Sequence, residues 1–293
     1  MTTVSPDTGV GPLLRGWREL RRISQLDLAL RADSSARHIS FIETGRSRPS
    51  EEMILRLAEH LDIPVRERNA LLVVAGYAPR YPQTPLDDPA MASVREGLDR
   101  LLAGYEPYPA LVVDGTYDVV AANRGIALLM EGIPEELLVP PLNAIRITLH
   151  PAGLAPRILN LREWRADLLA QMERQIALVR SPELRTLYEE VAAYPVRDRG
   201  AGTGDGARDG DGVGAGTDAE VGGRGRERTP SFALPLVIEH GGRVLSFIAS
   251  IATFNTPMDV TVAELAIETF LPADRETAAL SARTARVAVG RNP

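Results

Sequence analysis

The first 76 residues carry apolar residues at helical spacing, in short segments separated by polar turns. Leu13, Trp17 and Leu20 recur at i, i+4 and i+7, which predicts an amphipathic helix with arginines on its outer face. Four further segments follow, and each begins with residues that favour a helix start: serine for the next three and Pro64 for the last. The pattern therefore predicts five short helices between residues 12 and 76.

The second and third of these helices stand at a distinctive spacing. Gln25 is followed by Ala29, Asp33 and Ile39 at offsets of four, eight and fourteen residues. Ala29 is small enough to let two helices approach closely, and Ile39 fills the gap from the other helix. The spacing predicts two nearly perpendicular helices joined by a short turn.

Beyond residue 76 the pattern changes. Prolines and weak periodicity over residues 77–89 indicate a linker, and a helix is expected from about residue 90 to 103. Asp114-Gly115 and Gly241-Gly242 then lie between runs of strand-forming residues, and each pair predicts a hairpin turn. The second half should therefore contain antiparallel strands.

The strand after the second hairpin turn alternates apolar with more polar residues. Phe247 and Ala249 face one way, and Ser246 and Ser250 face the other. A helix predicted over residues 161–180 carries its own apolar stripe. We expect an α+β domain in which helices cover one face of an antiparallel sheet.

Residues 197–228 are rich in glycine, aspartate and arginine, and they cannot bury enough apolar surface to offset the entropy of ordering. They are predicted to be a disordered insertion. The expected layout is a disordered tail (1–11), a helical domain (12–76), a linker (77–89), an α+β domain carrying the insertion (90–275) and a C-terminal tail (276–293).

Composition narrows the classes of function. The chain has 293 residues, enough for two domains, and it lacks cysteine, which excludes disulfides, thiolate metal sites and a cysteine nucleophile. Its four histidines are too far apart for a short zinc pattern, so we expect no metal and no cofactor. No signal peptide or spanning segment is predicted, and a cytoplasmic protein is expected.

Charge is distributed unevenly. The net charge is −6, yet eight arginines and only four acidic residues lie between Arg15 and Arg48. A basic lobe on an acidic protein is typical of a domain that contacts DNA. A solvated helical face is the alternative.

Several of these features occur together in a known family. The pairs Ser24-Gln25 and Leu28-Ala29, the segment SSARHISFIETGRSRPS and the later LAEHLDI resemble the XRE, or Cro/cI-type, helix-turn-helix domains. The turn position that such domains usually fill with glycine is Asp33 here, which is tolerable because aspartate enters left-handed conformations more readily than most residues.

The resemblance implies that the second helix of the pair enters the major groove of duplex DNA. Candidates for contacts to base edges are Ser35, Arg37, His38 and Ser40, and Arg37 is suited to guanine. Gln25, Arg46 and Arg48 are candidates for phosphate contacts, and Ser24 completes the DNA-binding set. For each residue the alternative is an exposed side chain without a DNA contact.

The second half also resembles a known domain. The runs DVVAANRGIALLM, NAIRITLHPAGLAPRILN and ATFNTPMDVTVAELAIETFLPAD are similar to the ligand-binding domain of MmyB-like bacterial transcription regulators. The similarity spans roughly residues 105–275. It implies a PAS-like sensor domain that binds a fatty-acid-like molecule.

A ligand cavity would need apolar walls and a few polar groups. Two polar candidates, Arg146 and His150, stand in or after the apolar run IRITLH and suit an acyl carboxylate, with a surface salt bridge as the alternative. A plain packed core is the alternative for the apolar candidates, which are Ile126, Met130, Trp164, Leu168, Met172, Phe247 and Ile251.

The combined interpretation is a transcription regulator, not an enzyme, since no nucleophile motif or phosphate loop is present. Its expected partners are a double-stranded DNA operator, a small hydrophobic ligand and a second copy of the chain, without a membrane. The alternative is a C-terminal domain that serves only for dimerisation or protein interaction.

Overall fold

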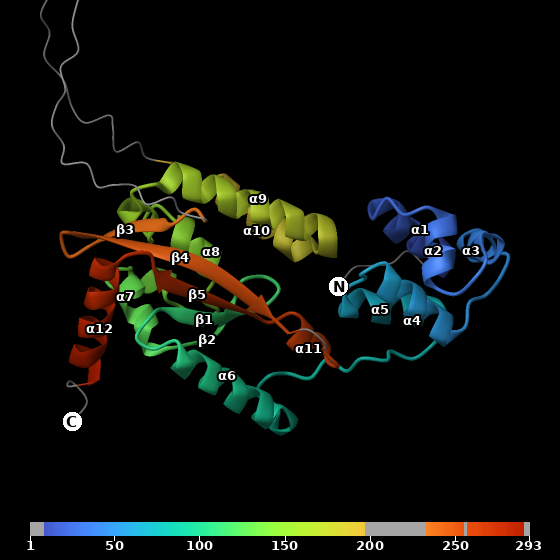
Figure 1. The fold of residues 1–293 in the computed structure, drawn as a ribbon, viewed down its shortest axis with the longest axis horizontal. Helices are drawn as coiled ribbons and strands as arrows, with labels where there is room; N and C mark the ends of the chain where they lie inside the picture. The colour runs from blue at the N-terminus through green and yellow to red at the C-terminus, as the bar shows by residue number, and fades with distance from the viewer. Residues whose placement is uncertain (1–8, 197–232, 255–256, 290–293) are drawn as a thin grey trace, which may run out of the picture.

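The computed structural model describes residues 9–196, 233–254 and 257–289. The predicted insertion at 197–228 lies outside the described residues. Figure 1 shows a bundle of short helices on one side and a sheet with its covering helices on the other, joined by an extended segment. Within the described ranges, no helix has the length and apolar character needed to cross a bilayer.

The N-terminal bundle contains the five predicted helices. Their bounds are α1 Val10–Leu20, α2 Gln25–Arg31, α3 Ala36–Glu43, α4 Glu51–His60 and α5 Val65–Val74. Serines cap three of them: the hydroxyls of Ser24, Ser35 and Ser50 each accept a bond from the backbone N–H three residues on, at 3.1 to 3.2 Å. The serine signals in the sequence therefore mark true helix starts.

Helix α1 begins two residues earlier than predicted, inside the range expected to be a disordered tail. Gly11 explains the difference. A Cβ atom on this residue would lie 2.2 Å from the carbonyl oxygen of Ile42, so only glycine lets α1 approach the end of α3 so closely. Val10 and Leu14 are then buried in one core with Trp17 and Ile39.

The rest of the described chain forms the α+β unit. Its helices are α6 Ala92–Gly104, α7 Ala127–Met130, α8 Ala144–Leu149, α9 Leu161–Val179, α10 Pro182–Ala192, α11 Val260–Ala263 and α12 Arg275–Val289. Short 3-10 turns span Pro89–Met91, Arg124–Ile126, Glu135–Leu137 and Ala155–Arg157. The strands are β1 Ala110–Val113, β2 Val119–Ala122, β3 Leu236–His240, β4 Arg243–Thr253 and β5 Ala266–Pro272.

The sheet is antiparallel, in the order β2-β1-β5-β4-β3. Both predicted hairpins are present, as β1-β2 and β3-β4. Strand β5 lies between them and pairs Ile267 with Val112 and Thr269 with Ser250. The antiparallel α+β layout is confirmed, and the hairpin signals did not predict the position of the central strand.

Helices cover both faces of this sheet, whereas the sequence analysis expected one covered face (Figure 1). Leu111 and Val113 of β1 pack toward α8, α9 and α10. Ala110 and Val112 pack on the opposite side against Leu98 of α6. The reason is that β1 is apolar at all four positions and buried throughout, so it needs a cover on each face.

The residues predicted as a C-terminal tail, 276–293, begin inside helix α12 instead. Asp274 caps this helix by accepting a bond from the backbone N–H of Thr277 at 2.7 Å. The buried hydroxyl of Thr277 accepts a bond from the N–H of Ser246 at 3.0 Å, which ties α12 to β4. Leu280 also packs against the core around Trp164, so polar bonds carry part of an attachment that the apolar pattern in the sequence did not reveal.

Candidate nucleic-acid interface and ligand cavity

Helices α2 and α3 meet through the turn that the spacing predicted. Ala29 and Ile39 are both about 99% buried where the helices cross. Asp33 has φ +48°, in the left-handed region, and the next residue closes the turn by donating from Ser34 N to the carbonyl of Ala29 at 2.8 Å. An aspartate therefore occupies the glycine-favouring turn position without disrupting the helix pair.

The outer face of α3 carries the four candidates for base contacts. Ser35 and Arg37 are exposed, and His38 and Ser40 are half-buried. The guanidinium of Arg37 lies 5.2 Å from the ring centroid of Phe41, and His38 Nδ1 lies 3.2 Å from the hydroxyl of Ser34. Arg37 is therefore an exposed, charged side chain in the first turn of α3.

The other candidates differ in whether their hydrogen-bond donors already have partners within the protein. Arg46 is exposed, 6.0 Å from the Phe41 centroid. Arg48 donates from Nη2 to the carbonyl of Ala75 at 2.7 Å, which ties it to the end of α5. Gln25 donates from Nε2 to a carboxylate oxygen of Glu43 at 2.8 Å, so part of its capacity serves the bundle itself.

A buried ion pair in this bundle was not foreseen. Arg18 donates from Nε to Glu43 Oε1 at 2.6 Å and from Nη2 to Oε2 at 2.8 Å, and it also reaches the carbonyl of Ile23 at 2.9 Å. The Glu43 carboxylate raises the pKa of Arg18. In the sequence these two residues are 25 positions apart and were counted among the surface charges.

A cavity of about 600 Å³ lies in the α+β unit, between the sheet and helices α7, α8 and α9. Most of its lining is aliphatic or aromatic. Five predicted ligand residues are among the lining residues: Ile126, Met130, Trp164, Leu168 and Ile251.

Two other predicted apolar candidates lie beside the cavity without lining it. Phe247 of β4 is fully buried in the cluster around Trp164, and Met172 of α9 is fully buried against α10. Both belong to the packed core, the alternative that the sequence analysis left open for them. Both residues lie on the apolar faces that the sequence predicted, but neighbouring side chains separate them from the cavity.

Arg146 and His150 lie away from the cavity. Arg146 makes a two-pronged ion pair with Glu190 of α10, with Nε–Oε1 and Nη2–Oε2 both at 2.8 Å. The ring of His150 stands edge-on to Tyr194 at 5.2 Å. The run IRITLH forms a short helix, so Ile145, Ile147 and Thr148 line the cavity while Arg146 lies against α10.

The polar groups that do line the cavity were missed. Glu268 of β5 is the main one, and Gln171 of α9, Ser250 of β4, Thr148 and the exposed Asp167 accompany it. Burial raises the pKa of Glu268 to about 7. The available signal was a charged residue inside the apolar run AIETFLP, which was not interpreted because that run had not been assigned as a strand.

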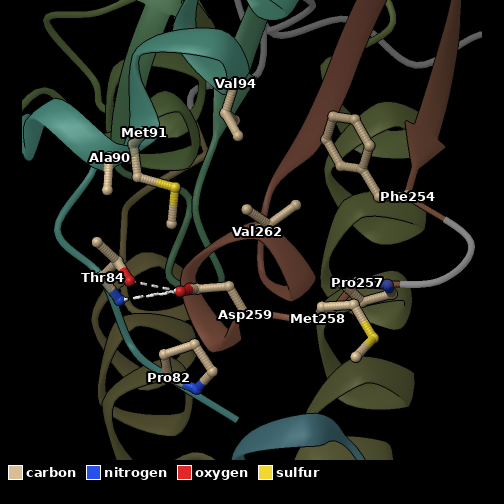
Figure 2. A pocket seen from close by; sticks show the side chains of 10 residues that line it. All are labelled: Pro82, Thr84, Ala90, Met91, Val94, Phe254, Pro257, Met258, Asp259 and Val262. Atoms are coloured by element: carbon tan, nitrogen blue, oxygen red, sulfur yellow. Dashed lines mark hydrogen bonds between the residues drawn. The ribbon is translucent and has the colours of Figure 1, made fainter.

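A second hollow of about 500 Å³ lies where the linker meets the end of β4 and α11. Figure 2 shows the carboxylate of Asp259 accepting bonds from the backbone N–H of Thr84 at 3.2 Å and from its hydroxyl at 2.7 Å. Val260 N also donates to the carbonyl of Pro82 at 2.8 Å. The linker is therefore attached to the sheet unit at this hollow.

Side chains of the helical bundle also contact the α+β unit directly. Arg66 of α5 pairs with Glu264 after α11, with Nε–Oε1 at 2.6 Å and Nη2–Oε2 at 2.7 Å. Arg180, at the end of α9, lies over the Trp17 ring at 4.9 Å and donates to the carbonyl of Gly16 at 3.4 Å. Helix α9 therefore borders the cavity near its start and contacts α1 just after its end.

Within the part of the chain that the structure describes, no three histidine or carboxylate side chains gather closely enough to hold a metal ion.

Comparison with known proteins adds two family matches. The model for the MmyB-like transcription regulator ligand binding domain matches residues 94–283, and a helix-turn-helix model matches residues 14–68. No curated protein matches the chain. The first match spans more than half of the 293 residues and includes the cavity, and the second includes the α2–α3 pair. The chain therefore belongs to the family of MmyB-like transcription regulators, with a helix-turn-helix DNA-binding domain and a ligand-binding domain.

Proposed function

We propose that this regulator reads an operator with helix α3 and holds one small hydrophobic molecule in the cavity of the α+β unit, and that occupancy of the cavity changes operator affinity. The observation that carries the proposal is the position of α9. It lines the cavity through Trp164 and Leu168, and just beyond its end Arg180 contacts α1 of the DNA-binding domain.

On the DNA side, Arg37 is proposed to grip a guanine edge, with Ser35, His38 and Ser40 beside it. Arg46 and Arg48, with Ser24 and Gln25 at the start of α2, are proposed to contact phosphates. The exposed position of Arg37 at the start of α3 supports its role. Two copies of the chain are expected on paired half-sites.

On the ligand side, about 600 Å³ falls in the usual range of small-molecule sites, roughly 300 to 1,000 Å³. The walls suit an aliphatic chain of the kind that a fatty acid carries. Each methylene group that leaves water for such a cavity contributes about 0.8 kcal/mol, or about fourfold in affinity. Affinity should therefore rise with chain length until the cavity is full.

The proposed coupling runs along α9. With 19 residues the helix is about 28 Å long, and it is continuous from the cavity to the contact with α1. A ligand that shifts α9 changes the contact of Arg180 with Trp17 and Gly16. Such a ligand alters operator affinity only if it binds one position of α9 more tightly than another.

The test uses the full chain, a duplex selected from a random pool, and straight-chain alcohols from hexan-1-ol to decan-1-ol. Fluorescence anisotropy should show operator affinity changing by about 5- to 150-fold at saturation, the usual range of such couplings. Binding of the alcohols themselves should strengthen with each methylene group. If every alcohol saturates the protein and operator affinity stays constant, the coupling is refuted and a purely structural C-terminal domain takes its place.

A matched pair of variants locates the coupling. Arg180→Ala should reduce the effect of the alcohol on operator affinity, while binding of alcohol alone and of DNA alone changes less than threefold. Arg185→Ala removes an exposed arginine from α10 and should leave the coupling intact. Equal effects of the two substitutions would exclude α9 as the route.

A further inference from the structure

The cavity contains a carboxyl group without a partner. Glu268 lies in the middle of β5, where its cross-strand neighbours are Leu111 of β1 and Ile251 of β4, both of which also line the cavity. Among the described residues, its side chain has no hydrogen bond and no ion pair. A largely desolvated carboxyl group without a hydrogen-bond partner costs free energy, so a donor placed in the cavity beside Glu268 would be stabilised.

The other described polar residues that line the cavity are neutral or acidic, so none of them supplies a positive charge. Gln171, Ser250 and Thr148 are neutral, and Asp167 adds a second carboxylate at an exposed position. No arginine, lysine or histidine is among the described lining residues. Arg146, the nearest basic candidate from the sequence, is held by Glu190 on another face of α8.

A further hydrogen-bond donor near the cavity is the indole N–H of Trp164. Among the described residues this N–H has no hydrogen-bond partner either, but the nitrogen is fully buried and a ligand in the cavity cannot reach it. A carboxylate head group would therefore meet Glu268 without a compensating positive charge. Two like charges at close range disfavour ionisation of both groups.

We propose that the ligand joins an apolar chain to an amine head group, and that this amine donates to the carboxylate of Glu268. The inference rests on the proposed function, because it assigns the head group of the same ligand. An ammonium in this position supplies both the donor and the opposite charge that the described lining lacks. Charge-assisted hydrogen bonds of this kind are short and strong.

The titration of Glu268 agrees with this assignment. Its pKa is raised to about 7 by burial, so the carboxyl is partly protonated near neutral pH. Leu111 and Ile251 are its neighbours on the adjacent strands, and Gln171 and Asp167 of α9 line the same cavity. Burial, together with the charge of Glu268, raises the pKa of Tyr117 to about 12, so this phenol stays neutral. Amine binding should therefore strengthen as pH rises through 7, because Glu268 becomes ionised.

The experiment compares three probes with the same chain: decylamine, decan-1-ol and decanoic acid, each below its micellar concentration. Calorimetry with the full chain at pH 7.5 should show decylamine binding at least tenfold more tightly than decanoic acid. In Glu268→Gln the amine should lose at least tenfold in affinity and the acid should gain. Decan-1-ol should change less than threefold.

Asp167→Asn is the matched control, because it removes the other carboxylate of the lining. It should leave the preference for the amine in place. If this variant abolishes the preference and Glu268→Gln does not, the assignment to Glu268 is overturned.

The outcomes separate this inference from the proposed function. Tighter binding of decanoic acid than of decylamine overturns the amine head group and leaves a hydrophobic-ligand sensor standing. Failure of all three probes to bind overturns both. Should Glu268→Gln not fold, the wild-type protein still decides: decylamine affinity must rise from pH 6 to pH 8 while that of decan-1-ol stays constant, and a constant amine affinity refutes the proposal.

Discussion

The helical bundle and the α+β unit differ in whether a carboxylate removed from solvent has hydrogen-bond partners. In the bundle, Glu43 is almost fully buried, and its carboxylate accepts bonds from Arg18 and Gln25. In the α+β unit, Glu268 is half-buried in the wall of a cavity, and among the described residues its carboxylate has no hydrogen bond and no ion pair. The network around Glu43 joins helices α1, α2 and α3. The carboxylate of Glu268 can still accept a hydrogen bond, for example from a ligand.

The difference fits the functions that we propose for the two regions. A surface that reads DNA must present its side chains from a rigid frame, and a fully satisfied polar network provides such a frame. If the cavity holds a ligand, as we propose, an unpartnered carboxyl group in its wall gives that ligand a polar group to bind. The predictions below test this contrast.

The largest effect is expected from breaking the satisfied network. Glu43→Ala leaves the guanidinium of Arg18 buried without its counter-ion, and such losses cost about 3 to 5 kcal/mol of folding free energy. Chemical denaturation of the variant measures this directly. Arg15→Ala removes one partner of the exposed Arg15–Glu19 pair and should cost less than about 0.5 kcal/mol. Similar losses in the two variants would contradict the contrast.

The unsatisfied group should appear in the pH dependence of stability. Because the folded-state pKa of Glu268, about 7, exceeds its value of 4.5 in an unfolded chain, the folded protein keeps a proton between these values that the unfolded chain has lost. Stability due to this group therefore falls as pH rises from 4.5 to 7, by roughly 3 kcal/mol, and is level above. Denaturation at pH 5, 6 and 8 should show this fall in the wild type relative to Glu268→Gln. A constant difference between the two proteins would show that Glu268 titrates normally.

The same substitution, alanine to leucine, made once in each region tests how tightly the side chains of that region are packed. Ala29→Leu places extra methylene groups where α2 and α3 cross and should destabilise the protein by about 1 to 3 kcal/mol. Ala249→Leu places the same atoms at the wall of the cavity and should cost less than about 1 kcal/mol. It should also lower the affinity for decan-1-ol, because the cavity is smaller. Thermal melting and calorimetry measure the two effects, and equal destabilisation would mean that the cavity is not free space.

The smallest effects on stability, and the most specific effects on function, are expected on the outer face of the bundle. Arg37→Ala should weaken binding to the preferred operator by about 1 to 3 kcal/mol and relax one base position. Arg46→Ala should weaken binding to all duplexes alike and flatten the salt dependence. Neither should shift the melting temperature by more than a few degrees. Equal losses on operator and random DNA for Arg37→Ala would remove it from the base-reading set.

Local features were predictable from the sequence. The caps at Ser24, Ser35 and Ser50, the left-handed turn at Asp33 and the two glycine-containing hairpins depend on a few neighbouring residues, and the structure has each of them. Five of the predicted cavity residues also line the cavity, because a helical stripe of apolar side chains has to face the sheet.

The features that carry the chemistry depended on contacts between distant segments. Glu268 reaches the cavity only because β5 lies between two hairpins that are more than 100 residues apart in the chain. The order of strands in a sheet cannot be predicted from local sequence patterns. Arg18 meets Glu43 because Gly11 lets α1 approach α3, and Arg146 turns to Glu190 because its short helix packs beside α10. The sequence by itself determined where helices and turns begin, since backbone hydrogen bonds and φ preferences act within a few residues. Only the tertiary structure decided which charges are paired and which one lines the cavity, because burial and electrostatic partners arise when distant elements pack together.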